Sequence, residues 1–129
     1  RWAIERDIRE AVRRHKKTCI KKLTKNKLTT IKSGVLKEAL KKKDPLIRKI
    51  MAEKSRILGL ACINLRHLFD PEMIVLGGGM IEACGDFMLP IIRKTVDADQ
   101  FFKKIKRCQV ASSKLNDDAV LLGAVALFQ

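Results

Sequence analysis

The sequence predicts an α/β fold in which helices pack on a small parallel sheet. Residues 72–76 form a short apolar run with β-branched residues at its centre, and residues 104–112 are a second strand candidate. A helical pattern separates them, and strand, helix and strand in that order form a right-handed crossover unit. Two strands make a thin sheet. We therefore expect the chain to be part of a larger protein.

The first two predicted helices lie in the N-terminal third. Apolar residues recur at helical spacing over residues 2–23, with charged residues between them, and predict one amphipathic helix. A second helix is predicted over residues 31–43. Thr29 or Thr30 is expected to cap it, because a threonine hydroxyl can accept a hydrogen bond from the first turn.

The third helix is predicted from Pro45 to about Phe69. Asp44 supplies an N-cap and Pro45 suits the first helical position. The second half of this helix is apolar on nearly all sides, so we expect it to be buried on most sides. Gly59 would let another element approach closely, and Asn64 is expected to bond a nearby backbone group.

Two helices complete the predicted order of helix, helix, helix, strand, helix, strand, helix. The segment 85–96 carries apolar residues at helical spacing, and the segment 118–128 ends the chain with a helix rich in small residues. Asn116 or Asp117 is expected to cap the last helix.

Charge is distributed unevenly along the 129 residues, whose net charge is +14. Residues 1–56 hold 20 Lys and Arg against 6 Asp and Glu, whereas residues 57–129 hold 8 of each. Such a basic half attracts polyanions, but runs of charge usually mark solvated helix faces. Trp2 is the one aromatic residue of the basic half, so platforms for base stacking are missing. The sequence thus favours a solvated surface over nucleic-acid binding.

The four cysteines are far apart in sequence and form no CxxC pair or zinc-ligand spacing. We interpret them as reduced, mostly buried thiols of a cytoplasmic protein. No apolar run approaches the roughly 18 residues of a membrane span, and the charged start of the chain does not resemble a secretory signal. The cysteines are Cys19, Cys62, Cys84 and Cys108.

Three consecutive glycines follow the first predicted strand. Ligands of open α/β sheets bind at the carboxyl ends of strands, and glycine lets a backbone approach a ligand closely. The spacing matches neither a P-loop nor the GxGxxG pattern of dinucleotide-binding folds. A tight turn without a ligand explains the glycines about as well.

With its flanks, this stretch resembles the C-terminal part of the ROK family of repressors and sugar kinases, within the actin-like, ribonuclease H-like ATPase superfamily. The resemblance covers about residues 30–128 and is most specific in two blocks. "LGLACINLRHLFDPEMIVLGGGM" is similar to the family's long helix, "NPE" turn and "IVLGGG" loop, and "DDAVLLGAVALF" to its closing helix. "LKEALKKKDPLIRKIM" and "MLPIIRKTV" match more weakly.

The resemblance implies an incomplete ribonuclease H-like domain. Residues 1–129 would be the C-terminal portion of a ROK-type nucleotide-binding domain, with 1–56 as its basic helical segment and 57–129 as helix, strand, glycine loop, helix, strand and helix. It also implies ATP and Mg²⁺ as cofactors, a sugar substrate and a homo-oligomer such as a dimer, with no membrane partner. The adenosine of ATP would contact Gly77, Gly78 and Gly79, with Met80 flanking the base or ribose.

Several family motifs are missing from the chain. It has no DxGxT phosphate loop, no general-base aspartate in the family's context and no cysteine cluster for the family's zinc. We expect no catalytic residue and no metal ligand here, because both would lie upstream, and we expect the chain alone to be inactive. His15 and His67 are interpreted as surface or packing residues. Asp117 and Asp118 are interpreted as helix-start residues rather than a metal pair.

Three functions remain open at this point. The chain could belong to an ATP-dependent sugar kinase that phosphorylates a hexose or an N-acyl-hexosamine, as in glucokinase-like proteins. It could belong to the sugar-sensing domain of a ROK transcriptional repressor. It could also be a non-catalytic α/β module whose basic half binds an acidic partner.

Overall fold

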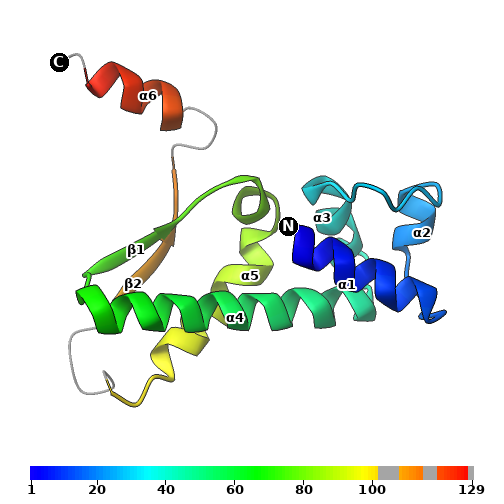
Figure 1. Ribbon diagram of the computed structural model, residues 1–129, viewed down its shortest axis with the longest axis horizontal. Coiled ribbons are helices and arrows are strands. Elements are labelled where there is room, and N and C mark those ends of the chain that lie inside the picture. The colour runs from blue at the N-terminus through cyan, green and yellow to red at the C-terminus, as the bar shows by residue number, and fades with distance from the viewer. Residues whose placement is uncertain (102–107, 115–118, 128–129) are drawn as a thin grey trace.

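The computed structural model describes residues 1–101, 108–114 and 119–127. Helices dominate, and two short strands lie side by side at one end of the long helix α4 (Figure 1). The elements in chain order are α1 (Trp2–Arg13), α2 (Ile20–Leu23), α3 (Ser33–Lys41), α4 (Pro45–Phe69), β1 (Met73–Leu76), α5 (Gly79–Asp97), β2 (Gln109–Ser112) and α6 (Ala119–Ala126).

The single helix predicted over residues 2–23 is wrong, because the structure divides it into α1 and α2. The break follows Arg13, and His15 takes a left-handed conformation with φ of 56°. The residues at the break are basic and exposed, so a continuous helix would bury nothing there. Apolar residues recur at helical spacing on both sides of this charged gap, which is why the sequence predicted one continuous helix.

The predicted threonine cap of the second helix is also wrong. α3 begins after Lys32 and has no side-chain cap, so neither Thr29 nor Thr30 caps it. Arg9 of α1 holds this connection, because its Nη1 donates to the carbonyl oxygens of Leu28 and Thr29, each at 3.0 Å. The loop is thus fixed by a side chain from a different helix.

The prediction for α4 is confirmed at both ends. The side chain of Asp44 accepts a hydrogen bond from the backbone N–H of Ile47 at 3.0 Å, which is the expected N-cap. Asp70 ends the helix in a left-handed conformation with φ of 41°. Asn64 is exposed on this helix.

α4 packs tightly on α5 at one glycine. A Cβ at Gly59 would lie 2.6 Å from the Cβ of Thr95 and 3.2 Å from the carbonyl oxygen of Ile92. The close approach predicted for Gly59 is therefore confirmed. Thr95 hydrogen-bonds the carbonyl of Ile91 on its own helix at 2.8 Å, which fixes its rotamer.

Burial of α4 and of the first strand is less complete than predicted. Leu60 of α4 is 55% exposed, and Met73 and Val75 of β1 are 49% and 57% exposed. α4 packs on α1, α3 and α5, and in its second half only Gly59, Cys62 and Arg66 are buried. The predictions of a helix buried on most sides and of a buried strand are therefore wrong for this chain.

The two strands form a parallel pair, as predicted. Met73 pairs with Gln109 at one end of the register and Leu76 with Ser112 at the other. β1 starts one residue later than predicted, and the part of the second predicted strand at 104–107 lies outside the described residues.

The last two helices also differ from their predicted bounds. α5 starts at Gly79 instead of residue 85, because Gly78 makes the turn directly after the strand. α6 spans Ala119–Ala126 within the predicted 118–128, and the proposed caps Asn116 and Asp117 lie outside the described residues.

One hydrophobic core joins the basic half to the rest of the chain. Apolar residues of α1, α3, α4 and α5 are buried in the same cluster as Val110 of β2. None of the helices over the described ranges is long and apolar enough to cross a membrane. Fully buried members of the core include Ile8, Ile20, Ile31, Leu36, Ile47, Met51 and Ile92.

Candidate functional site

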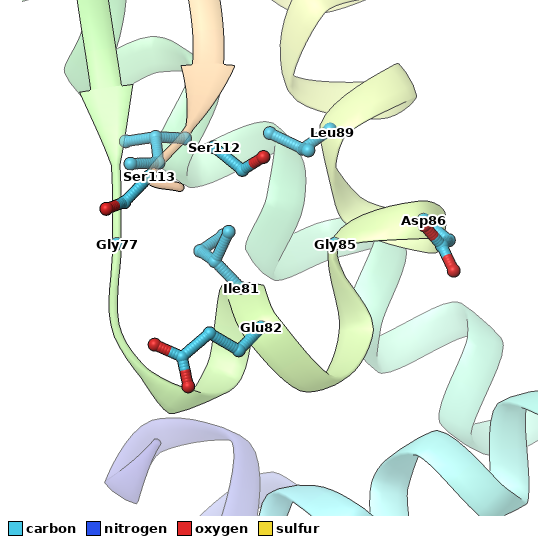
Figure 2. A pocket seen from close by; sticks show the side chains of 9 residues that line it. Gly77, Ile81, Glu82, Gly85, Asp86, Leu89, Ser112 and Ser113 are labelled. Carbon is cyan, nitrogen blue, oxygen red and sulfur yellow. The ribbon is translucent and has the colours of Figure 1, made fainter. Parts of the chain in front are cut away.

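A cavity of about 200 Å³ opens at the carboxyl ends of the two strands. Figure 2 shows it between the end of the sheet and the first turns of α5. This is the edge of a parallel sheet where α/β proteins bind ligands. The described residues that line it are Leu76, Gly77, Ile81, Glu82, Gly85, Asp86, Leu89, Ser112 and Ser113.

The glycine turn determines the shape of this cavity. The backbone N–H of Ser113 donates to the carbonyl of Leu76 at 2.7 Å and extends the strand pairing by one bond. Gly77 then passes close to the second strand, since a Cβ on it would lie 3.5 Å from the Cβ of Ser113. Gly78 turns the chain with φ of 92° and ψ of 159°, a conformation open essentially only to glycine.

The structure places the four predicted nucleotide-site residues in different positions. Gly77 lines the cavity. Gly78 and Gly79 form the turn and the first residue of α5, and a Cβ on either would meet nothing within 4 Å. Met80 is half-buried and packs against the hydrophobic core. The turn therefore places its backbone near the cavity, while the Met80 side chain contributes to packing.

The polar side chains of the cavity were not predicted from the sequence. Ser112 ends β2 and Ser113 follows it, and Glu82 and Asp86 come from α5. The two carboxylates are four residues apart on α5, but Figure 2 shows Glu82 pointing toward the glycine turn and Asp86 pointing away from the strands. That spacing was available in the sequence, whereas the serines required the strand register.

The polar lining is rich in hydrogen-bond acceptors. Carboxylates accept hydrogen bonds only, and serine hydroxyls both donate and accept. No lysine or arginine is among the lining residues that the structure describes. Such a cavity suits an uncharged ligand with hydroxyl or amino donors, and two carboxylates oppose a phosphate group.

The cysteines are free thiols, as predicted. Cys62, Cys84 and Cys108 are buried, and burial raises the pKa of each thiol, which disfavours the reactive thiolate. Burial, followed by the hydrogen bond to Asp44, also raises the pKa of Cys19. Over the described parts of the chain, no group of three or more metal-binding side chains occurs; Asp117 and Asp118 lie outside those parts.

Neither histidine is among the residues that line the cavity. His15 is exposed at the break after α1. His67 Nε2 lies 2.7 Å from Asp99 Oδ2, and its ring centroid is 5.2 Å from that of Phe101. The hydrogen bond from His67 lowers the pKa of Asp99. His67 thus joins the end of α4 to the segment after α5.

The structure is an α/β fold with a cavity at the carboxyl ends of its two parallel strands. The chain belongs to the ROK family, whose family model matches residues 15–129.

Relatives of two kinds are similar to this chain. A xylose repressor of Caldicellulosiruptor bescii is 28% identical over 90 residues, which is 70% of this chain and 22% of the repressor. A β-glucoside kinase of Klebsiella pneumoniae is 43% identical over 42 residues, which is 33% of this chain and 14% of the kinase. The chain therefore spans less than a quarter of either relative.

A solved structure has the same arrangement. A protein of Cytophaga hutchinsonii that is named as a sugar kinase superposes with a TM-score of 0.67 at 25% identity, covering 78% of this chain and 33% of that protein. The predicted α/β class with a parallel strand pair is thus confirmed, and the chain is similar to part of a sugar-kinase structure.

Proposed function

We propose that this chain forms the adenosine-binding wall of the nucleotide cleft in an ATP-dependent sugar kinase of the ROK family. The observation that carries the proposal is the cavity beside Gly77, at the carboxyl ends of β1 and β2, with carboxylates and hydroxyls in its lining. The kinase relative and the similarity to a sugar-kinase structure support the same reading.

The acceptor-rich lining suits a nucleoside more than a phosphate. The hydroxyls of a ribose and the amino group of an adenine donate hydrogen bonds. Glu82, Asp86 and the two serines can accept them. The phosphates and Mg²⁺ would then be bound by other parts of the full-length protein. Phosphoryl transfer also needs a base and an aligned hydroxyl, which we assign to those parts together with the rest of the ribonuclease H-like domain.

ATP titration of the full-length protein tests the site through Gly78→Val. We expect at least tenfold weaker ATP binding, about 1.4 kcal/mol, because valine at φ of 92° is strained and must reshape the turn. Isothermal titration calorimetry gives the affinity. Gly34→Ala is the matched glycine control, since a Cβ there meets nothing within 4 Å.

Glu82→Gln gives a second measurement if the valine variant fails to fold. Glu82 is exposed, so the exchange leaves packing intact, and it removes a charged acceptor from the cavity. We expect severalfold weaker ATP binding. Unchanged ATP affinity in both variants would contradict the proposal that this cavity binds the nucleotide.

A repressor is the second candidate function, and the lengths of the alignments favour it. The xylose repressor aligns over 90 residues and the kinase over 42. In that case the full-length protein would bind a sugar without phosphorylating it. An assay for ATP-dependent sugar phosphorylation separates the two functions, as does an upstream DxGxT loop as opposed to an N-terminal DNA-binding segment.

A further inference from the structure

Four lysines surround one hollow in the basic half of the chain. Lys17 and Lys22 come from the region around α2, and Lys42 and Lys43 from the turn between α3 and α4. Figure 1 shows α2 and α3 at the same end of the molecule as the start of α4. The hollow measures about 530 Å³, and its remaining lining residues are Thr18, Cys19, Asp44 and Pro45.

Asp44 holds these two segments together. Its Oδ2 accepts hydrogen bonds from the Thr18 hydroxyl at 2.9 Å and from the Cys19 backbone N–H at 2.6 Å, while its Oδ1 caps α4 through Ile47. Asp44 is only 5% exposed. The residues next to Lys17 are therefore fixed against the residues next to Lys43, and the four lysines are neighbours because of the fold.

The positive charge of the hollow is poorly balanced by the residues that the structure describes. Lys42 lies 3.5 Å from Glu38, and both side chains are about half exposed. Within the described ranges, no ion pair within 4 Å involves Lys17, Lys22 or Lys43. The one carboxylate of the lining, Asp44, is occupied by its three donors. Unpaired like charges around one hollow repel each other, and a bound polyanion relieves that repulsion.

We propose that these four lysines bind a chain of phosphates, either the backbone of a nucleic acid or polyphosphate. Among the described residues, the lining contains lysine and no arginine. Arginine is the usual partner where carboxylates are bound in a bidentate way. Trp2, the one aromatic residue of residues 1–56, lies with its ring 5.3 Å from the guanidinium of Arg6 on α1. Contacts would therefore go to phosphates without base stacking or base preference.

The hollow changes the interpretation of the basic half. From sequence alone, its charge is best explained as a solvated surface. The structure places four of these charges around one concave site. Lysines that served only to solvate the surface would have no need to gather in this way. The hollow shares no residue with the glycine cavity, so this inference does not depend on the proposed nucleotide site.

The test measures the salt dependence of binding by the full-length protein. A 20-base-pair duplex of arbitrary sequence and inorganic polyphosphate are titrated separately by fluorescence anisotropy or competition from about 50 to 200 mM salt. The variant replaces Lys17, Lys22 and Lys42 with glutamine. Each phosphate contact contributes about 0.9 to the slope of log K against log salt on a duplex, so the slope should fall by about 3.

The control variant removes the same charge elsewhere. It replaces Lys32, Lys49 and Lys94, which are exposed and do not line the hollow, with glutamine. We expect its slope to stay within about 1 of the wild-type value. Thermal unfolding of both variants checks that the fold is kept.

The two ligands identify the source of the phosphates. If the variant of Lys17, Lys22 and Lys42 loses duplex binding alone, the ligand of the hollow is a nucleic acid. If it loses polyphosphate binding alone, the ligand is polyphosphate. Loss of both supports a general phosphate site. Equal losses in the hollow and control variants would overturn the proposal, and so would binding of polyglutamate at the same lysines as tightly as polyphosphate, which would indicate an acidic protein partner.

Discussion

Replacing Gly59 with valine should destabilise the protein by about 3 kcal/mol or more, because overpacking at a closed contact costs roughly this much. An added Cβ would lie 2.6 Å from the Cβ of Thr95 and 3.2 Å from the backbone oxygen of Ile92. A backbone atom of α5 moves only with its helix, so α4 and α5 must separate. Gly59→Ala should destabilise the protein less than Gly59→Val, since alanine has a higher helix propensity than glycine, which offsets about 1 kcal/mol of the loss.

Urea unfolding followed by circular dichroism measures this effect. Gly34→Ala is the control, because a Cβ at Gly34 meets nothing within 4 Å, and its midpoint should stay the same or rise. Adding Thr95→Gly to Gly59→Ala removes the opposing Cβ and should restore part of the stability relative to the sum of the single changes. A wild-type midpoint for Gly59→Val would mean that the two helices do not approach so closely.

Removing the Asp44 carboxylate should have a comparable effect. Asp44→Ala loses the N-cap of α4, about 1 kcal/mol. It also leaves the Cys19 N–H and the Thr18 hydroxyl without their acceptor, and an unsatisfied group costs about 1–3 kcal/mol. We expect a total loss of about 2–4 kcal/mol. Asp44→Asn is the matched control, because its amide oxygen keeps part of this hydrogen bonding.

The contribution of Asp44 should depend on pH in a defined direction. Burial raises the pKa of Asp44, but the hydrogen bonds from Cys19, Ile47 and Thr18 outweigh burial, so the pKa in the fold lies below its ordinary value of 3.8. The charged form therefore stabilises the fold fully above about pH 3.8, and this stabilisation is lost as the pH falls through the lower pKa of the folded state.

Thermal unfolding of wild type and Asp44→Asn between pH 3 and pH 7 tests this direction. The difference in Tm should be constant above about pH 4.5 and shrink below pH 3.8. A difference that grows as the pH falls would show that the pKa of Asp44 is raised in the folded protein instead.

α4 was predictable from sequence because explicit signals mark both of its ends. Asp44 with Pro45 begins it, and Asp70 followed by Pro71 ends it. The break between α1 and α2 was not, because a helical pattern of apolar residues on both sides outweighed a short basic gap. Burial of the helix and strand was overestimated for another reason: apolar composition shows which residues can be buried, while the elements that cover them are a property of the assembled fold.

The candidate site was only partly predictable. The glycine run after an apolar strand indicated where a ligand could bind, and Gly77 does line a cavity there. Ser112 and Ser113 join the site because the second strand pairs in register with the first, and that register depends on contacts distant in sequence. The lysine hollow depends in the same way on Asp44, which brings together segments about 25 residues apart.

Replacing the left-handed residues that follow α1 and α2 with glycine should raise the thermal stability of the protein. His15 and Lys25 have positive φ after α1 and α2, at positions where glycine is the preferred helix terminator. The left-handed conformation destabilises the fold by roughly 1–2 kcal/mol for a residue with a Cβ. Glycine avoids this cost, but its greater freedom in the unfolded chain destabilises the fold by about 0.5–1 kcal/mol, which is less. Glycine at these positions should therefore raise the melting temperature. Neither residue lines the cavity or the lysine hollow, so a more robust protein could be engineered with both surfaces unaltered.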